Sequence, residues 1–243
     1  MDQPHIVKSF DQDLGQIESL LLEMGGLVES QISGSVKAMI ERDEELAGKV
    51  RAADKRVDEL DLKIDDHSVK LLALRQPMGE DLRCVVSAMK VSNSLERVGD
   101  FSKNIAKRTT VLSQSKPVGS STNTIRRMSN MVQEMMHDVL DAYIARDLVV
   151  AEDLRRRDED VDQMHNMLFR ELLTYMMEDA RNITPCMHLL FIAKNIERMG
   201  DHTTGIAEQV FYLVRGELPD DDRPKRDMTS YMSAEPLPDQ VGE

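Results

Sequence analysis

The chain has 243 residues, enough for one large domain or two modest ones, with no Trp and only 4% aromatic residues. Its abundance of Leu, Met, Ala, Glu, Lys and Arg is typical of long helices, so we expect an all-α fold. The formal net charge of -13 argues against a nucleic-acid partner, because binding to phosphates needs a concentrated basic face.

The first half of the chain predicts three helices. Residues 10–28 carry apolar side chains at spacings of four and three, which keeps them on one face of a helix. A second helix is expected over about 43–74 and ends before Pro77, because the residue before a proline is pushed out of the helical region. A third is expected over 82–112, and the Ser, Pro and Gly content of 113–123 predicts a linker.

The second half repeats this plan. Residues 125–139 form another apolar helical stripe, and further helices are expected over about 147–180 and 185–215. The segment 217–243 is rich in proline and charge and has no apolar period, so we expect a disordered tail.

Sequence repeats indicate that the two halves are related. NSLERVGDFSKNIA, from Asn93, matches KNIERMGDHTTGIA, from Lys194, at a shift of 101 residues. VKAMIERD at 36–43 resembles LDAYIARD at 140–147 at a shift of 104. We therefore predict two tandem three-helix bundles related by internal duplication. The predicted extents of the two bundles and the tail are 1–115, 116–216 and 217–243.

Neither a membrane span nor a disulfide framework is expected. No apolar run approaches the roughly 18 residues of a spanning helix, and MDQPHIVKSF at the start lacks the pattern of a signal peptide. We therefore expect a cytoplasmic protein. Cys84 and Cys186 are too few and too isolated for disulfides or a thiolate zinc site, and both are expected to be buried, reduced thiols.

The repeated motif places a glutamate and an aspartate four residues apart, and the second helix of each unit has a similar pair of aspartates. Residues i and i+4 lie about 6 Å apart on one helix face, so each pair sets like charges side by side. Because this spacing occurs four times at equivalent positions of the two units, it indicates that the paired carboxylates have a function. The pairs are Asp54 with Asp58, Glu96 with Asp100, Asp158 with Asp162, and Glu197 with Asp201.

Carboxylates from two facing helices are the ligands that hard or borderline cations prefer. We therefore predict that each unit binds divalent or trivalent metal ions, of the kind Mg, Mn, Fe or Zn. Gly99 and Gly200, which lie between the paired acids, would let a helix or an ion approach closely. Asp61, and His165 at the equivalent place in the second unit, are further candidate ligands.

Two alternatives stay open. Basic neighbours such as Arg51, Arg155 and Lys103 could make ordinary surface ion pairs with the acids, which would give a metal-free helical adaptor. Glu134 and His137 form an E-x-x-H, a spacing used in ferritin-like carboxylate metalloenzymes, but that fold needs two such motifs and the sequence has one. No Gly-rich phosphate loop or nucleophile elbow is present, so we predict no catalytic residue.

The stretch LALRQPMGEDLRCVVSAMKVSNSLERVGDFSKNIAKR (72–108), with its echo IAKNIERMGDHTTGIA (192–207), resembles the PhoU family, the phosphate-transport regulators of bacteria. The likeness spans about residues 10–215. It implies a fold of two three-helix bundles and multinuclear metal clusters at E/D-x-x-x-D pairs, which here are the four pairs named above. Asn104 would offer a polar ligand in the first unit only, because Gly205 takes its place in the second.

The resemblance further implies a cytoplasmic negative regulator of the phosphate-starvation response, and not an enzyme. Such a protein couples the high-affinity phosphate ABC importer to a sensor histidine kinase. The expected partners are the ATPase subunit of that importer, the kinase and a second copy of the chain in a homodimer, with the inner membrane met only through partners. Bound cations would cancel the repulsion between carboxylates, hold the second and third helices together and set the face presented to partners.

Overall fold

A computed structural model describes residues 3–219 of the chain, and its side chains from Phe10 onward. Within this part every regular element is a helix, which confirms the predicted all-α fold. No helix among these residues combines the length and the apolarity that crossing a membrane requires. The tail predicted over 217–243 lies outside the described residues from 220 onward.

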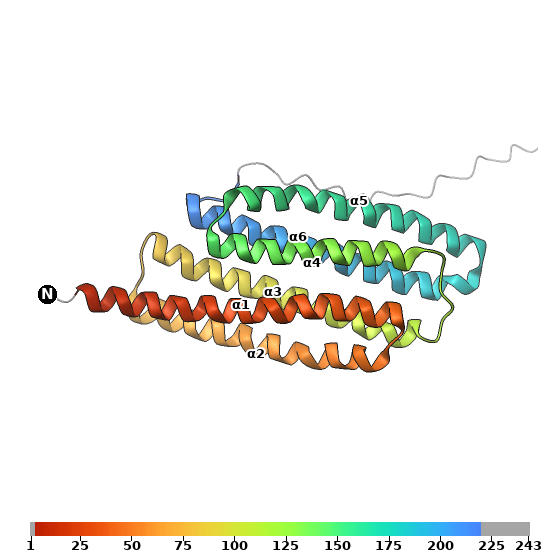
Figure 1. The fold of residues 1–243 in the computed structure, drawn as a ribbon, viewed down its shortest axis with the longest axis horizontal. Helices are drawn as coiled ribbons and strands as arrows, with labels where there is room; N and C mark the ends of the chain where they lie inside the picture. Colours follow the sequence, from red (N-terminus) through yellow and green to blue (C-terminus); the bar gives the residue numbers. More distant parts are fainter. Residues whose placement is uncertain (1–2, 220–243) are drawn as a thin grey trace, which may run out of the picture.

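Within the described residues, six long helices and one short 3-10 turn follow one another (Figure 1). They are α1 (Gln3–Glu41), α2 (Glu44–Arg75), α3 (Glu80–Leu112), α4 (Ser121–Ala145), α5 (Leu148–Glu178), η1 (Ala180–Asn182) and α6 (Ile183–Arg215). The stripe predicted over 10–28 is therefore only the middle of a longer first helix. The stripe predicted over 125–139 is likewise only the middle of α4, and the other four predicted helices begin and end within about two residues of the observed ones.

Aspartates begin the second helix of each repeat. The Asp43 carboxylate accepts a hydrogen bond from the backbone N–H of Leu46, 2.9 Å away, at the start of α2. Asp147 does the same at the start of α5, where it accepts from the N–H groups of Val149 and Val150. These bonds satisfy N–H groups that have no partner inside the helix, and each stabilises the fold by about 1 kcal/mol.

The start of α6 differs slightly from the prediction. The helix begins at Ile183, two residues before the expected start at 185. Pro185 therefore lies in the first turn of the helix, where proline is tolerated because the N–H that it lacks would have no partner there. The η1 turn, Ala180–Asn182, separates this helix from α5.

The helices form two three-helix bundles that lie side by side (Figure 1). In the first bundle α1, α2 and α3 pack on one another, and in the second α4, α5 and α6 do so. The bundles meet along α3 and α6 and along α1 and α4, whereas α2 and α5 lie on the outer sides. This arrangement confirms the predicted tandem bundles, and we keep 1–115 and 116–216 as the proposed limits of the two repeats.

Where the bundles meet, α3 and α6 run antiparallel. The Lys90 ammonium lies 5.4 Å from the ring centre of Tyr212, and further along α3 the ring centroids of Phe101 and His202 are 5.6 Å apart. Phe101 and His202 are equivalent positions of the repeat, related by the shift of 101 residues. An approximate two-fold axis therefore passes between these two side chains.

One hydrophobic core runs through both bundles. Gly25 on α1 lies directly under Leu140 on α4, because a Cβ at Gly25 would collide with the Leu140 side chain. Cys84 and Cys186 are buried free thiols, as predicted. Fully buried side chains of the core come from every long helix, among them Ile17, Leu60, Leu95, Met128, Leu168 and Ile196.

Candidate functional site

The acids of the first repeat lie where α2 packs on α3. Spacings of four and three put Asp54, Asp58 and Asp61 on one stripe of α2, and Glu96 and Asp100 lie one turn apart on α3. Asp54 is buried, Asp58 is exposed, and the other three carboxylates are partly buried. We refer to these five residues as the first acidic cluster.

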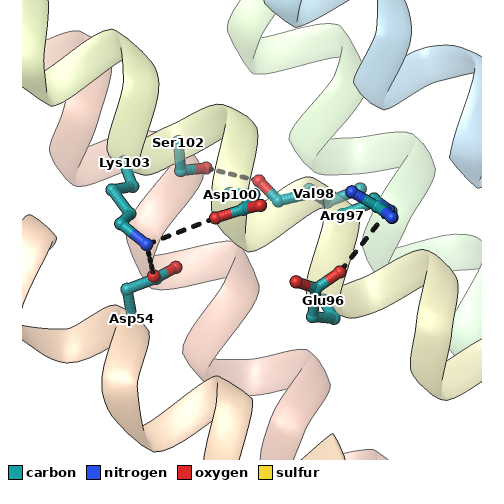
Figure 2. Close-up of polar contacts among 7 residues, drawn as sticks. All are labelled: Asp54, Glu96, Arg97, Val98, Asp100, Ser102 and Lys103. Atoms are coloured by element: carbon teal, nitrogen blue, oxygen red, sulfur yellow. Dashed lines mark hydrogen bonds and ion pairs between the residues drawn. The ribbon is translucent and has the colours of Figure 1, made fainter.

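Lys103 bridges the two helices within the first acidic cluster (Figure 2). Its ammonium donates hydrogen bonds to Asp54 on α2, at 2.5 Å, and to Asp100 on its own helix, at 3.3 Å. Glu96 lies one turn away and pairs with Arg97 instead, with the Arg97 Nε and the Glu96 Oε2 3.6 Å apart. A side chain of the protein thus balances part of the negative charge.

Negative charge nevertheless remains in excess in the first acidic cluster. Partial desolvation raises the pKa of Asp58 although its side chain reaches water, and the charges of Asp54 and Asp100 add to this shift against the opposing charge of Lys103. Burial also raises the pKa of Glu96, with the Asp100 carboxylate as the next cause. These carboxylates therefore share one electrostatic environment, which a bound cation would stabilise.

A buried glutamine from α1 faces the same space. Gln31 is 3% exposed, and neither its amide oxygen nor its amide nitrogen has a hydrogen-bond partner among the described residues. The Gln31 Oε1 lies 3.1 Å from the point where a Cβ of Gly99 would stand, and the Asp54 Oδ1 lies 3.5 Å from that point. A buried amide without a partner is costly, so this geometry suits an additional ligand between Gln31 and Asp54.

The further candidates of the first repeat differ in their surroundings. Asp61 accepts a hydrogen bond of 2.6 Å from the Ser92 hydroxyl, which holds its carboxylate at the side of the cluster. Asn104 is exposed one turn beyond Asp100 and, in the described part of the chain, forms no hydrogen bond to another candidate ligand. A role of Asn104 as a ligand stays a prediction.

The second repeat buries its candidate ligands more deeply. Asp201 on α6 is partly exposed. A Cβ on Gly200 would lie 2.5 Å from the Asp158 Oδ1, so this glycine lets α5 and α6 pack closely around the carboxylate, as Gly99 does for α1 and α2 at α3. Four candidate ligands, each 1–4% exposed, are Asp158, Asp162, His165 and Glu197.

In the second repeat, basic side chains pair with the acids from positions that differ from that of Lys103 in the first repeat. The Lys194 Nζ lies 2.8 Å from the Glu197 Oε2, on the same helix. Arg155 is 4% exposed and pairs with the Glu152 carboxylate at 3.2 Å. Thr204 stands in the position that Lys103 has in the first repeat, and it carries no charge. The two repeats therefore share their paired acids but place their lysines at different positions.

The donor set fits a hard or borderline divalent cation, because carboxylate and amide oxygens come from three helices around one partly buried space. Across the described residues, however, no three His, Cys, Asp or Glu side chains already converge on one point. In the first cluster the Lys103 ammonium lies between Asp54 and Asp100. Metal binding would therefore have to move side chains, and Lys103 above all.

The E-x-x-H pair lies in a surface groove that none of the candidate ligands lines. The His137 Nδ1 is 3.4 Å from the Glu29 Oε1, and the Arg157 guanidinium is 3.9 Å from the Glu134 carboxylate. In ferritin-like enzymes this motif projects into the bundle core. The exposed position of His137 therefore argues against that alternative.

Comparison with known proteins gives the family. The family model described as the PhoU domain matches residues 21–109 and, a second time, residues 125–210. The chain belongs to the PhoU family. A "Phosphate-specific transport system accessory protein PhoU homolog" from Caulobacter vibrioides (strain NA1000 / CB15N) is 47% identical over 93% of this chain and 98% of its own length. A homologue of the same name from Rhizobium meliloti (strain 1021) is 42% identical, over 96% and 99%.

Solved PhoU structures have the same fold. The crystal structure of PhoU from Pseudomonas aeruginosa matches with a TM-score of 0.82 and 38% identity, over 86% of this chain and 100% of that one. The phosphate transport system regulatory protein PhoU from Streptococcus pneumoniae matches with a TM-score of 0.80 and 29% identity, over 87% and 99%. The fold expected from the resemblance to PhoU is therefore confirmed.

Sequence reasoning did not single out Gln31 as a member of this PhoU site. A signal was available, since Gln31 stands three residues after Val28 and so continues the core-facing stripe of α1. A glutamine in such a place has two polar groups to satisfy. The repeat comparison could not reveal it, because the equivalent position of the second repeat, at the shift of 104, is the apolar Met135.

Proposed function

We propose that this PhoU-family chain is an accessory protein of phosphate-specific transport and a negative regulator of the phosphate-starvation response. The names of its relatives from Caulobacter vibrioides and Rhizobium meliloti carry the accessory role, and the Streptococcus pneumoniae protein is called regulatory. The observation that carries the proposal is the double match to the PhoU domain, at 21–109 and 125–210, in a chain that is 47% identical to such a relative.

In this proposal the chain acts by binding, and we assign it no catalytic residue. It couples the phosphate ABC importer to a sensor histidine kinase, with the ATPase subunit of the importer and the kinase as its partners. A second copy completes a homodimer, and the cytoplasmic protein reaches the inner membrane only through partners. The net charge of -13 supports contacts with basic protein surfaces rather than with nucleic acid.

Metal ions enter the proposal as structural ligands. A bound Mg, Mn, Fe or Zn ion would supply positive charge to carboxylates that otherwise repel one another. The raised pKa of Asp58 and of Glu96 supports this assignment, because burial disfavours the charged form of both carboxyls and neighbouring carboxylates add to the shift. The ions would be held by Asp54, Asp58, Glu96 and Asp100 in the first repeat and by Asp158, Asp162, Glu197 and Asp201 in the second, with Asp61 and His165 as further candidates.

Complementation in a bacterium that lacks its own PhoU tests the regulatory role. A reporter behind a phosphate-starvation promoter stays active there in rich phosphate, and expression of this chain is expected to switch it off. The variant with Asp100→Asn and Asp201→Asn is expected to repress less well, whereas Asp160→Asn, at an exposed acid of α5, serves as the matched control. Continued reporter activity with the wild-type chain would overturn the proposed function.

Complementation combined with elemental analysis of the protein separates the regulatory role from metal binding. Full repression by the double variant, with no metal in elemental analysis of untagged wild-type protein, would refute the proposed metal binding. The proposed regulatory role would stand. That combination of results describes the metal-free helical adaptor. Weak repression by the double variant, together with metal in the wild-type protein, supports the proposal as a whole.

A further inference from the structure

Lys103 bridges α2 and α3 at the Asp54–Asp100 end of the first acidic cluster (Figure 2). Its ammonium contacts one carboxylate on each of the two facing helices, Asp54 on α2 at 2.5 Å and Asp100 on α3 at 3.3 Å. These two carboxylates are also among the proposed metal ligands of the first repeat. A lysine ammonium and a metal ion therefore compete for the same oxygens.

We propose that Lys103 is a tethered counter-ion of the first acidic cluster, which a divalent cation must displace in order to bind, so that Lys103 sets the cation affinity of the first repeat. The inference rests on the metal binding included in the proposed function. In this inference Lys103 controls the cation concentration at which the first acidic cluster binds an ion, in addition to forming ion pairs.

The charges around Lys103 favour its replacement by an ion of higher charge. The Lys103 ammonium contacts two of the five carboxylates of the first acidic cluster, Asp54 and Asp100. A divalent ion at the same place interacts about twice as strongly with each carboxylate as an ammonium does. The cluster is thus only partly satisfied by its own lysine.

The exposure of the side chains decides which group can leave. The Lys103 side chain is 37% exposed, whereas the Asp54 side chain is 3% exposed. Lysine carries its charge on a flexible four-carbon stem, so the ammonium can turn into water while the carboxylate stays in place. Displacement of Lys103 therefore requires no movement of the helices.

Gln31 gives an independent indication that the cluster accepts another ligand. Both amide atoms of this buried side chain lack a hydrogen-bond partner among the described residues, although the Asp54 carboxylate is close by. The Lys103 ammonium satisfies Asp54 and Asp100 but leaves Gln31 without a bond. An ion seated between Asp54 and Gln31 would satisfy the amide oxygen as well.

A titration of full-length protein with Mn²⁺ tests the proposal. All variants carry Asp201→Asn, which weakens the second cluster, and are stripped with EDTA and dialysed before isothermal titration calorimetry. Lys103→Met is expected to bind Mn²⁺ about tenfold more tightly, because it removes a charge-assisted hydrogen bond that the ion must break. Its melting temperature is expected to fall without Mn²⁺ and to recover when Mn²⁺ is added.

Two further variants serve as controls. Lys103→Arg keeps the positive charge and is expected to retain the affinity of the parent. Lys107→Met removes a positive charge from an exposed position one turn along the same helix and is also expected to match the parent. Lys103→Gln, which keeps a donor but not the charge, replaces the Met variant if that one does not fold, with the same expected gain in affinity.

The outcomes distinguish failure of the inference from failure of the proposed metal binding. Equal or weaker Mn²⁺ binding by Lys103→Met, with clear binding by the parent, would refute the proposed competition between Lys103 and the cation. The proposed metal site itself would stand. An equal loss of melting temperature with and without Mn²⁺ would do the same, because it would give Lys103 a purely structural role. Absence of Mn²⁺ binding in both proteins, and in the chain without Asp201→Asn, would overturn the metal sites and the inference together.

Discussion

At the scale of single residues, Gly200 and Gly205 on α6 respond to the same substitution in opposite ways. A Cβ at Gly200 would lie 2.5 Å from the Asp158 Oδ1, a distance that real Cβ atoms do not tolerate. A Cβ at Gly205 would meet no atom within 4 Å. Two positions five residues apart on one helix therefore differ, because the packing requires glycine at 200 and does not require it at 205.

Substitution by alanine at these two positions provides a test. Gly205→Ala is expected to raise the free energy of unfolding by about 0.5–1 kcal/mol, because alanine loses less conformational entropy in a helix. Gly200→Ala is expected to lower it by about 1–3 kcal/mol, because the new methyl group overpacks the contact with Asp158. Urea unfolding of both variants measures the difference, and equal effects would refute the close packing at Gly200.

The first acidic cluster also predicts a dependence of stability on pH. Burial and neighbouring carboxylates raise the pKa of Asp58 and of Glu96 in the folded chain. The folded state therefore holds more protons than the unfolded state at acid pH, and stability falls as the pH rises. This contribution is fully present below about pH 4 and is lost as the pH rises through the raised pKa values.

Thermal unfolding of EDTA-stripped protein between about pH 4 and pH 7 measures this effect. The variant with Asp58→Asn and Glu96→Gln cannot gain or lose these protons. Its melting temperature is therefore expected to decrease less with rising pH than that of the wild type. The comparison removes the contribution of the remaining net charge, which both proteins share. Parallel pH curves would show that the pKa values of these two carboxyls are not raised in the folded state.

The acids could be predicted from the sequence, whereas the groups between them could not. Spacing fixes which side of a helix Asp54 and Asp58 occupy, so a repeated i, i+4 pair is visible in one dimension. Which basic side chain reaches across to Asp54 depends on how α3 is rotated against α2, and the sequence left Lys103 among several ordinary ion pairs. Gln31 comes from a third helix, and no local pattern connects it to the acids.

At the scale of elements, residues at the helix ends allow the sequence to predict where the helices begin and end. Asp43 and Asp147 cap α2 and α5 through their side chains, and both lie at the predicted starts. Pro77 marks the end of α2 because it restricts the residue before it. Pro185 is less informative, because proline is accepted both before a helix and within its first turn. The predicted start of α6 was therefore late by two residues.

The two caps give a prediction that uses the repeat. Asp43→Ala and Asp147→Ala are each expected to lower the free energy of unfolding by about 1 kcal/mol, since each leaves backbone N–H groups without their acceptor. The double variant is expected to show the sum, because the caps belong to different bundles. Asp43→Asn and Asp147→Asn keep the acceptor and are expected to stay close to the wild type in chemical denaturation. A loss in the Asn variants as large as in the Ala variants would exclude capping as the cause.

At the scale of the whole molecule, the two bundles share one core. Buried side chains of all six long helices belong to it, and Gly25 on α1 packs directly under Leu140 on α4. Phe101 and His202 meet across the approximate two-fold axis. The sequence predicted two units but not how they face each other, because an internal repeat defines the units and leaves their contact surface undetermined.

This shared core predicts that the bundles unfold together. Scanning calorimetry is expected to give one transition whose calorimetric and van't Hoff enthalpies agree, because neither bundle can open without exposing apolar surface of the other. Two separate transitions would show that each repeat is stable by itself. Truncated chains are not needed for this measurement, so it avoids any change to the interface.

The length of α3 has a mechanical consequence for the acids near its middle. The helix has 33 residues and is therefore about 50 Å long. A tilt of about 5° around its midpoint would carry each end through about 2 Å, while the residues at the midpoint hardly move. Glu96 and Asp100 stand close to this pivot, and the exposed Leu74 and Met78 lie at the α2–α3 end of the rod. If a change of charge near Glu96 and Asp100 tilts α3, the largest displacement is therefore expected at the two ends of the helix.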